Sequence, residues 1–131
     1  MFSHAQLEGI LLSMAKPEIH ISRANNTQLG YRVRVRVNFR GSKDFIYGLQ
    51  RTLNQKGIDC SAKDFEHKSR PRPILTVGGM VNLWKLCKLV PDLPDAKNAW
   101  PTFKKVVEII DNGEHHTLQG LDKILQLKGE I

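Results

Sequence analysis

Apolar and polar residues alternate strictly over residues 31–40, which read YRVRVRVNFR. A period of two predicts a β-strand, because successive side chains of a strand point to opposite faces. A solvated outer face is one interpretation of the polar positions. A binding surface for anionic groups is the alternative, because Arg makes bidentate contacts with phosphates and guanine edges. The polar positions of this strand are Arg32, Arg34, Arg36, Asn38 and Arg40.

The spacing of apolar residues predicts helices on both sides of this strand. Ser3 and Gln6 form a capping-box signature for a helix over residues 5–16, which is apolar almost all round and ends before Pro17. A second helix starts after Gly41 and Ser42 and ends at Gly57. Three more are expected over residues 80–90, 96–112 and 118–131. Their expected caps and buried residues are Asp95, Thr117, Met80, Leu83, Trp84, Cys87, Trp100, Phe103, Val106, Val107, Ile110, Leu118, Leu121, Ile124 and Leu125.

Two hairpins complete the predicted fold. Residues 18–24 alternate like a strand and are joined to residues 31–40 by the turn-rich stretch 25–30. A second hairpin is expected from residues 58–68 and 70–77, with Pro71 and Pro73 confining the start of its second strand to an edge or a bulge. The resulting order is αββαββα. We therefore predict one α+β domain over residues 1–131, in which a four-stranded antiparallel sheet has helices on one face and leaves the other face open.

The positive charge is concentrated in one part of the chain. The net charge is +7, and residues 1–72 hold 13 Lys and Arg against 6 Asp and Glu, whereas residues 73–131 hold 7 against 7. This asymmetry favours one electropositive surface and a polyanionic partner. The sequence has no long apolar stretch for a membrane span, and Cys60 and Cys87 form no paired motif. We expect a soluble intracellular protein, in the cytoplasm or an organelle matrix, without a membrane role.

Other chemical candidates are weak. His115 and His116 are adjacent and cannot both face one metal from a regular helix, so they are interpreted as helix-entry residues. Gly78 and Gly79 are not followed by the Lys-Ser/Thr of a phosphate loop. No serine or cysteine nucleophile stands out. We expect no metal ligands, no cofactor and no catalytic residue from these patterns.

The C-terminal stretch KNAWPTFKKVVEIIDNGEHHTLQGLDKILQLK resembles the closing segment of LAGLIDADG homing endonucleases. Near the N-terminus, LEGILLSMA (residues 7–15) aligns with the LAGLIDADG motif without a gap, and Leu7, Gly9 and Ile10 agree. Leu12 and Met14 stand at the two acidic positions of the motif. The C-terminal residues that carry the resemblance are Lys97, Phe103, His116, Thr117, Gly120, Leu121, Lys123, Ile124 and Lys128.

The resemblance implies a sheet that lies along the DNA major groove and a subunit without the catalytic acid. In the family the second acid binds the divalent metal, and a thioether is a poor ligand for such a hard cation. A sequence-specific binder of double-stranded DNA that does not cut is therefore expected. The positions that would contact DNA are His20, Ser22, Arg23, Arg32, Arg34, Arg36, Asn38, Arg40, Lys63, Lys68, Arg70 and Arg72.

The resemblance also implies a homodimer formed through the first helix. The expected interface residues are Leu7, Glu8, Gly9, Leu11 and Leu12. Two alternatives remain open at this point. One is an active endonuclease that uses Mg²⁺ and Glu18, or a subunit with an active partner. The other is an RNA-binding maturase for group I introns.

Overall fold

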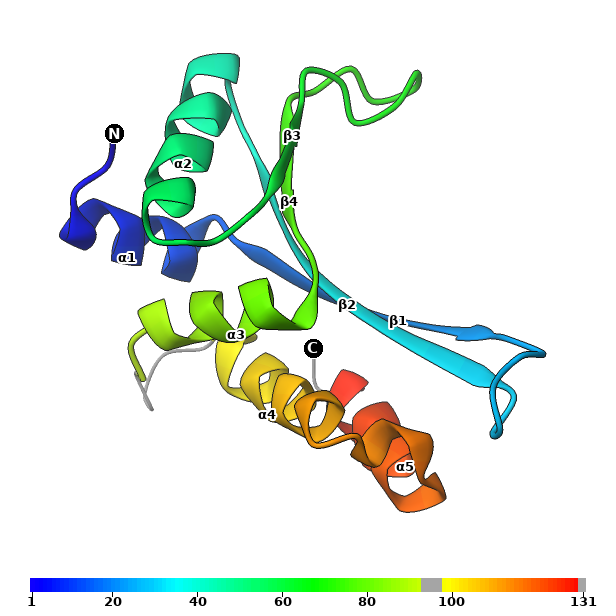
Figure 1. Ribbon diagram of the computed structural model, residues 1–131. Coiled ribbons are helices and arrows are strands. Elements are labelled where there is room, and N and C mark those ends of the chain that lie inside the picture. Colours follow the sequence, from blue (N-terminus) through cyan, green and yellow to red (C-terminus); the bar gives the residue numbers. More distant parts are fainter. Residues whose placement is uncertain (93–97, 130–131) are drawn as a thin grey trace. The chain divides into compact units, whose positions relative to one another are not determined.

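A computed structural model describes residues 1–92 and 98–129. Helices and strands alternate over these residues in the predicted αββαββα order, followed by two further helices (Figure 1). The elements are α1 (His4–Ser13), β1 (Lys16–Arg23), β2 (Tyr31–Arg40), α2 (Lys43–Gln55), β3 (Ser61–Lys63), β4 (Ile74–Val77), α3 (Met80–Leu89), α4 (Trp100–Asp111), the short 3-10 helix η1 (Glu114–His116) and α5 (Leu118–Lys128). β2 has the bounds predicted from its alternation.

The strands of the described residues form one four-stranded antiparallel sheet in the order β1-β2-β4-β3. This confirms the predicted α+β class. β4 lies between β2 and β3 and begins at Ile74, directly after Pro73. The strand therefore begins after both prolines, later than the predicted start at residue 70. Both prolines precede the strand, so they remove no hydrogen bond from its ladder.

The chain divides into two compact units, of which the first comprises residues 1–16 and 36–91. Its core lies on one face of the sheet, where Val37, Phe39, Leu75 and Val77 are fully buried. α2 packs against β3 and β4 beside this face (Figure 1). Ile46, Leu49 and Leu53 of α2 are buried, and Ser42 caps the helix by accepting from the Phe45 N–H.

The first helix of this unit has the predicted capping box. Ser3 Oγ accepts from the Gln6 N–H, and Gln6 Oε1 accepts from the Ser3 N–H at 2.9 Å. Leu7, Ile10 and Leu11 are buried, while Ala5 and Gly9 are exposed. The exposed side of α1 thus carries small and polar residues, and its buried side carries large aliphatic ones.

Trp84 of helix α3 was predicted to be buried, and this prediction is wrong. Leu83, Leu86 and Cys87 form its buried stripe, whereas Trp84 is exposed and lies beneath the Lys88 ammonium, 3.4 Å from the ring centroid. Trp84 is therefore not a core residue. A cation above the ring is attracted to its negative face, which stabilises this exposed arrangement.

The second unit comprises residues 17–35 and 92–131. The β1–β2 turn is closed by the Ala24 N–H, which donates to the Gly30 carbonyl at 2.9 Å. α4 begins at Trp100, with Pro101 in its first turn as expected, and Trp100 is buried. The predicted Asp95 cap and Lys97 lie outside the described residues.

Helix α5 packs against α4 and η1, but with a different stripe from the predicted one. Leu121 and Ile124 are buried as expected, whereas Leu118 and Leu125 are exposed and Leu127 is buried instead. Thr117 caps the helix by accepting from the Gly120 N–H at 3.0 Å. His115 and His116 lie in η1, immediately before this cap, which agrees with their interpretation as helix-entry residues.

No helix among the described residues has both the length and the apolar character needed to cross a membrane.

Gly120 has no room for a side chain, and this generates a prediction about stability. A Cβ atom at residue 120 would lie 1.8 Å from the Glu114 carbonyl oxygen. We expect Gly120→Ala to destabilise the protein by about 1–3 kcal/mol or more, because the backbone of η1 must shift. Gly48→Ala is the matched control: Gly48 is also a buried helical glycine, but its added Cβ would only touch the Phe2 ring at 3.6 Å. Thermal unfolding followed by circular dichroism compares the two, and equal melting temperatures would contradict the prediction.

Candidate nucleic-acid interface

Two rows of side chains cross the face of the first unit's sheet that is opposite its core. Directly opposed residues of antiparallel strands share a face, so the two registers define both rows. The first row consists of Asn38, Thr76 and Ser61. The second row consists of Arg40, Ile74 and Lys63. Arg36, two residues before Asn38 on β2, extends the same face and is exposed. Neighbouring strands are roughly 5 Å apart, so the cations of this face are closely spaced.

Asn38 is the least accessible of these polar residues. It is only 2% exposed, and its Oδ1 accepts from the Thr76 hydroxyl at 2.7 Å. A buried amide needs such a partner, because an unsatisfied polar group is costly to bury. Asn38 was predicted as a DNA contact, and here its side chain links β2 to β4 through this hydrogen bond.

Arg40 forms an ion pair with Glu66, which follows β3. Arg40 Nε donates to Glu66 Oε1 at 3.1 Å, and Nη2 donates to the same oxygen. The side chains are 23% and 15% exposed, so the pair is partly withdrawn from water. The hydrogen bond from Arg40, together with the positive charges of Arg40 and Arg70, holds the pKa of Glu66 below its usual value. Glu66 is therefore negatively charged at neutral pH.

The segment between β3 and β4 continues the hairpin beyond the strands. The Glu66 N–H donates to the Arg72 carbonyl at 2.9 Å, and His67 and Arg70 exchange backbone hydrogen bonds across a turn formed by Lys68 and Ser69. These bonds hold the basic residues of the segment on a hairpin tip.

A second contact anchors the base of this hairpin to α2. The Tyr47 hydroxyl donates to Asp64 Oδ1 at 2.8 Å, and Lys43 Nζ lies 3.4 Å from Asp64 Oδ2. The hydrogen bond lowers the pKa of Asp64 and raises that of Tyr47. Asp64 and Glu66 thus attach the hairpin to two different elements of the unit.

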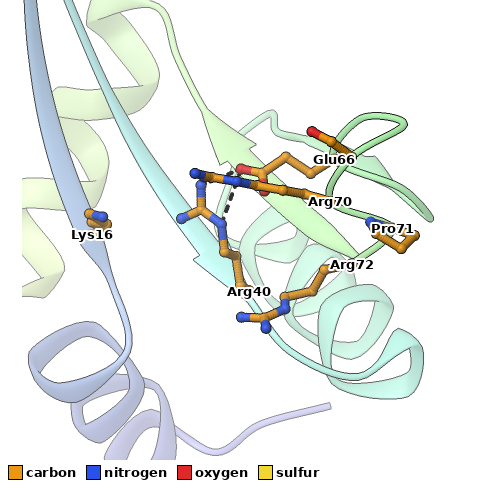
Figure 2. A pocket seen from close by; sticks show the side chains of 7 residues that line it. Lys16, Arg40, Glu66, Arg70, Pro71 and Arg72 are labelled. Carbon is orange, nitrogen blue, oxygen red and sulfur yellow. Dashed lines mark hydrogen bonds and ion pairs between the residues drawn. The ribbon is translucent and has the colours of Figure 1, made fainter.

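Two hollows lie along this surface. One, of about 400 Å³, is lined by Arg36, Asn38, Ser61, Lys63, Glu66, His67, Ile74 and Thr76. The other, of about 610 Å³, is lined by Lys16, Arg40, Glu66, Ser69, Arg70, Pro71 and Arg72 (Figure 2). Figure 2 shows Arg70 extending across the second hollow toward Arg40 and Glu66. Glu66 lines both hollows.

The remaining predicted contact residues lie on the β1–β2 hairpin of the second unit. His20, Ser22, Arg23 and Arg34 are exposed. Arg32 is half-buried and its Nη2 donates to Asn26 Oδ1 at 3.2 Å. These positions remain predicted contacts.

Lys16, Glu66 and Thr76 belong to the surface but were missed by sequence reasoning. Lys16 precedes the part of β1 that was recognised, and Thr76 was treated only as part of a strand. Glu66 had a usable signal: it is an acid inside a basic stretch, followed by Lys68, Arg70 and Arg72. An isolated acid among cations is a candidate for an ion pair.

The end of α1 carries no carboxylate at the two motif positions. Leu12 is half-buried, and Met14 is the C-cap, 43% exposed, with its N–H donating to the Ile10 carbonyl at 2.8 Å. Glu18 lies on β1, where its Oε1 is 3.6 Å from His20 Nε2. Within residues 1–92 and 98–129, no three His, Cys, Asp or Glu side chains are grouped so that they could hold a metal ion.

The predicted interface residues of α1 differ in their exposure within one chain. Leu7 and Leu11 are buried. Glu8 and Leu12 are half-buried, and Gly9 is exposed with no atom within 4 Å of an added Cβ. All five stay predicted interface residues.

Solved structures of homing endonucleases are similar to the whole chain. The homing endonuclease I-TnaI superposes with a TM-score of 0.83 over 99% of this chain and 88% of its own, at 19% identity. The fold is that of the LAGLIDADG homing endonucleases. The LAGLIDADG meganuclease I-CpaMI bound to uncleaved DNA has a TM-score of 0.80 over 98% of this chain, at 19% identity. The meganuclease I-SmaMI bound to uncleaveable DNA has a TM-score of 0.83 over 98% of this chain, at 14% identity.

The chain spans 44–45% of the I-SmaMI and I-CpaMI chains. No protein-family model matches the sequence. No curated protein matches it either. At these identities the likeness establishes the fold.

Proposed function

We propose that this protein binds double-stranded DNA sequence-specifically, with its sheet in the major groove, and does not cut it. The observation that carries the proposal is the cationic sheet face, where Arg36, Arg40 and Lys63 lie beside the basic hairpin tip. The major groove is about 12 Å wide and admits a two-stranded β-ribbon. Arg side chains can read guanine edges there, while the other cations position the phosphate backbone. The DNA in the I-SmaMI and I-CpaMI structures supports duplex DNA as the partner of this fold.

The lack of cleavage is inferred from Leu12 and Met14. Activation of water at a phosphate by a divalent metal needs carboxylate ligands, and the end of α1 offers an alkyl chain and a thioether at the motif positions. The side chain of Met14 is exposed, so its position is accessible to a substrate but lacks an oxygen ligand. The protein would then retain the recognition surface of a nuclease scaffold as a regulator or a recognition module.

A homodimer is the form that we propose for binding. One chain corresponds to less than half of the I-SmaMI and I-CpaMI chains, and two copies would supply a surface of comparable extent. Two-fold symmetry of the protein would be matched by a pseudo-palindromic site. The exposed Gly9 side of α1 provides a place where two backbones can approach closely.

The first prediction concerns base recognition by the arginine strand. Arg34→Ala should weaken binding to a duplex selected from a random pool by about 1–3 kcal/mol, because one exposed base-reading side chain is lost. Fluorescence anisotropy measures the affinity. Arg51→Ala, which removes an equal charge from an exposed position of α2, should change it much less. The logarithm of affinity against the logarithm of salt should have a slope of about −0.9 for each phosphate neutralised. Tighter binding to structured RNA than to duplex DNA would favour the maturase alternative.

The second prediction concerns cleavage. Incubation of the protein with the selected duplex and Mg²⁺ or Mn²⁺ should leave both strands intact, because the metal-binding acid of the motif is absent. Denaturing gels detect nicks and double-strand breaks. Sequence-specific cutting that disappears in Glu18→Ala would overturn this part of the proposal and identify an active enzyme.

The third prediction concerns the dimer. Gly9→Leu should shift the protein to monomers, because a leucine would separate the two α1 helices, while the open space around Gly9 allows the chain itself to fold. Analytical ultracentrifugation measures the state of association. Gln55→Leu adds an exposed leucine at the end of α2 and should leave the dimer intact. A monomeric wild type, or an unchanged dimer in Gly9→Leu, would refute the interface.

A further inference from the structure

The Arg40–Glu66 pair lines the larger of the two hollows described above. The side chains of Lys16, Arg70 and Arg72 line this hollow together with the pair (Figure 2). Four cations and one carboxylate therefore line this hollow. An excess of positive charge remains after Glu66 has been neutralised, and it attracts a further anion.

The donors of Arg40 are arranged for an oxyanion. Both Nε and Nη2 donate to Oε1 of Glu66. A guanidinium presents its donors as a fixed fork that matches a carboxylate and a phosphate alike. The Glu66 carboxylate therefore occupies the position in which a phosphate oxygen would receive the same hydrogen bonds.

The backbone around Glu66 is held independently of its side chain. The Glu66 N–H is bonded to the Arg72 carbonyl, and Asp64 fixes the base of the hairpin through Tyr47. Rotation of the Glu66 side chain alone can release Arg40, without loss of the hairpin.

We propose that the Glu66 carboxylate occupies the Arg40 site in place of a DNA backbone phosphate. It excludes a phosphate from this site until a correctly placed duplex displaces the Glu66 side chain. The inference rests on the proposed DNA binding and adds a regulatory role at the same surface. A duplex phosphate that enters the hollow accepts the hydrogen bonds of Arg40 and is also attracted by Arg70. A duplex in a wrong register leaves the Arg40–Glu66 pair intact and loses one phosphate contact. Glu66 thereby weakens non-specific binding more than specific binding.

The experiment compares Glu66→Gln with Asp59→Asn on a duplex of random sequence. Both variants remove one negative charge from the first unit, and Asp59 is an exposed residue outside both hollows. Glu66→Gln should raise non-specific affinity about fivefold and steepen the salt dependence by about 0.9, because Arg40 then neutralises one more phosphate. Asp59→Asn should change the affinity by about twofold or less and leave the slope unchanged. The ratio of specific to non-specific affinity should fall only in Glu66→Gln.

Two further variants make the test specific to the pair. Glu66→Ala should raise the non-specific affinity as Glu66→Gln does. This comparison excludes an effect of the glutamine amide that the Gln variant introduces. In an Arg40→Ala background, Glu66→Gln should no longer increase affinity beyond the Asp59→Asn effect, because no guanidinium is released.

The outcomes separate this inference from the proposed function. Duplex binding by all folded variants, with equal gains in Glu66→Gln and Asp59→Asn, overturns the role of Glu66 and leaves DNA binding in place. A gain that persists in the Arg40→Ala background also overturns it. Failure of the folded wild type and of Glu66→Gln to bind any duplex overturns both proposals.

Discussion

The antiparallel register of β2 with β4 is the constraint on which the rest of the first unit depends. Val37 opposite Val77 and Phe39 opposite Leu75 close the core, and the same register sets Asn38 opposite Thr76 and Arg40 opposite Ile74 on the other face. A shift of one residue would exchange the two faces and bury arginines. Burial of the apolar set, at about 25 cal/mol per Å² of apolar surface, therefore also fixes the positions of the cations. The cationic face is thus a consequence of core formation.

Repulsion among the cations is reduced by two acids of the β3–β4 hairpin. Glu66 neutralises Arg40 beside the sheet, and Asp64 joins Lys43 and the Tyr47 hydroxyl at α2. Each contact also fixes the hairpin to a different element. Both acids thus reduce the repulsion among the cations, and Asp64 also holds the base of the hairpin to α2.

Local signals predicted the fold well where one pattern determined one element. The alternation of residues 31–40 gave β2 its bounds, and Ser3, Ser42 and Thr117 cap the helices that they were expected to cap. Apart from the start of β4, the errors concern the faces of helices. Trp84, Leu118 and Leu125 are apolar and have helical spacing, but a face is chosen by packing partners far along the chain. For the same reason Glu66 was missed as the partner of Arg40, which is 26 residues away.

The hydrogen bond between Thr76 and Asn38 couples two neighbouring strands on the polar face. Replacement of Asn38 alone would leave the Thr76 hydroxyl without this acceptor, and replacement of Thr76 alone would leave a buried amide to find another donor. A change at this point of the sheet that keeps the hydrogen bond therefore requires matched changes at both positions. During evolution, the residue types at positions 38 and 76 should therefore change together.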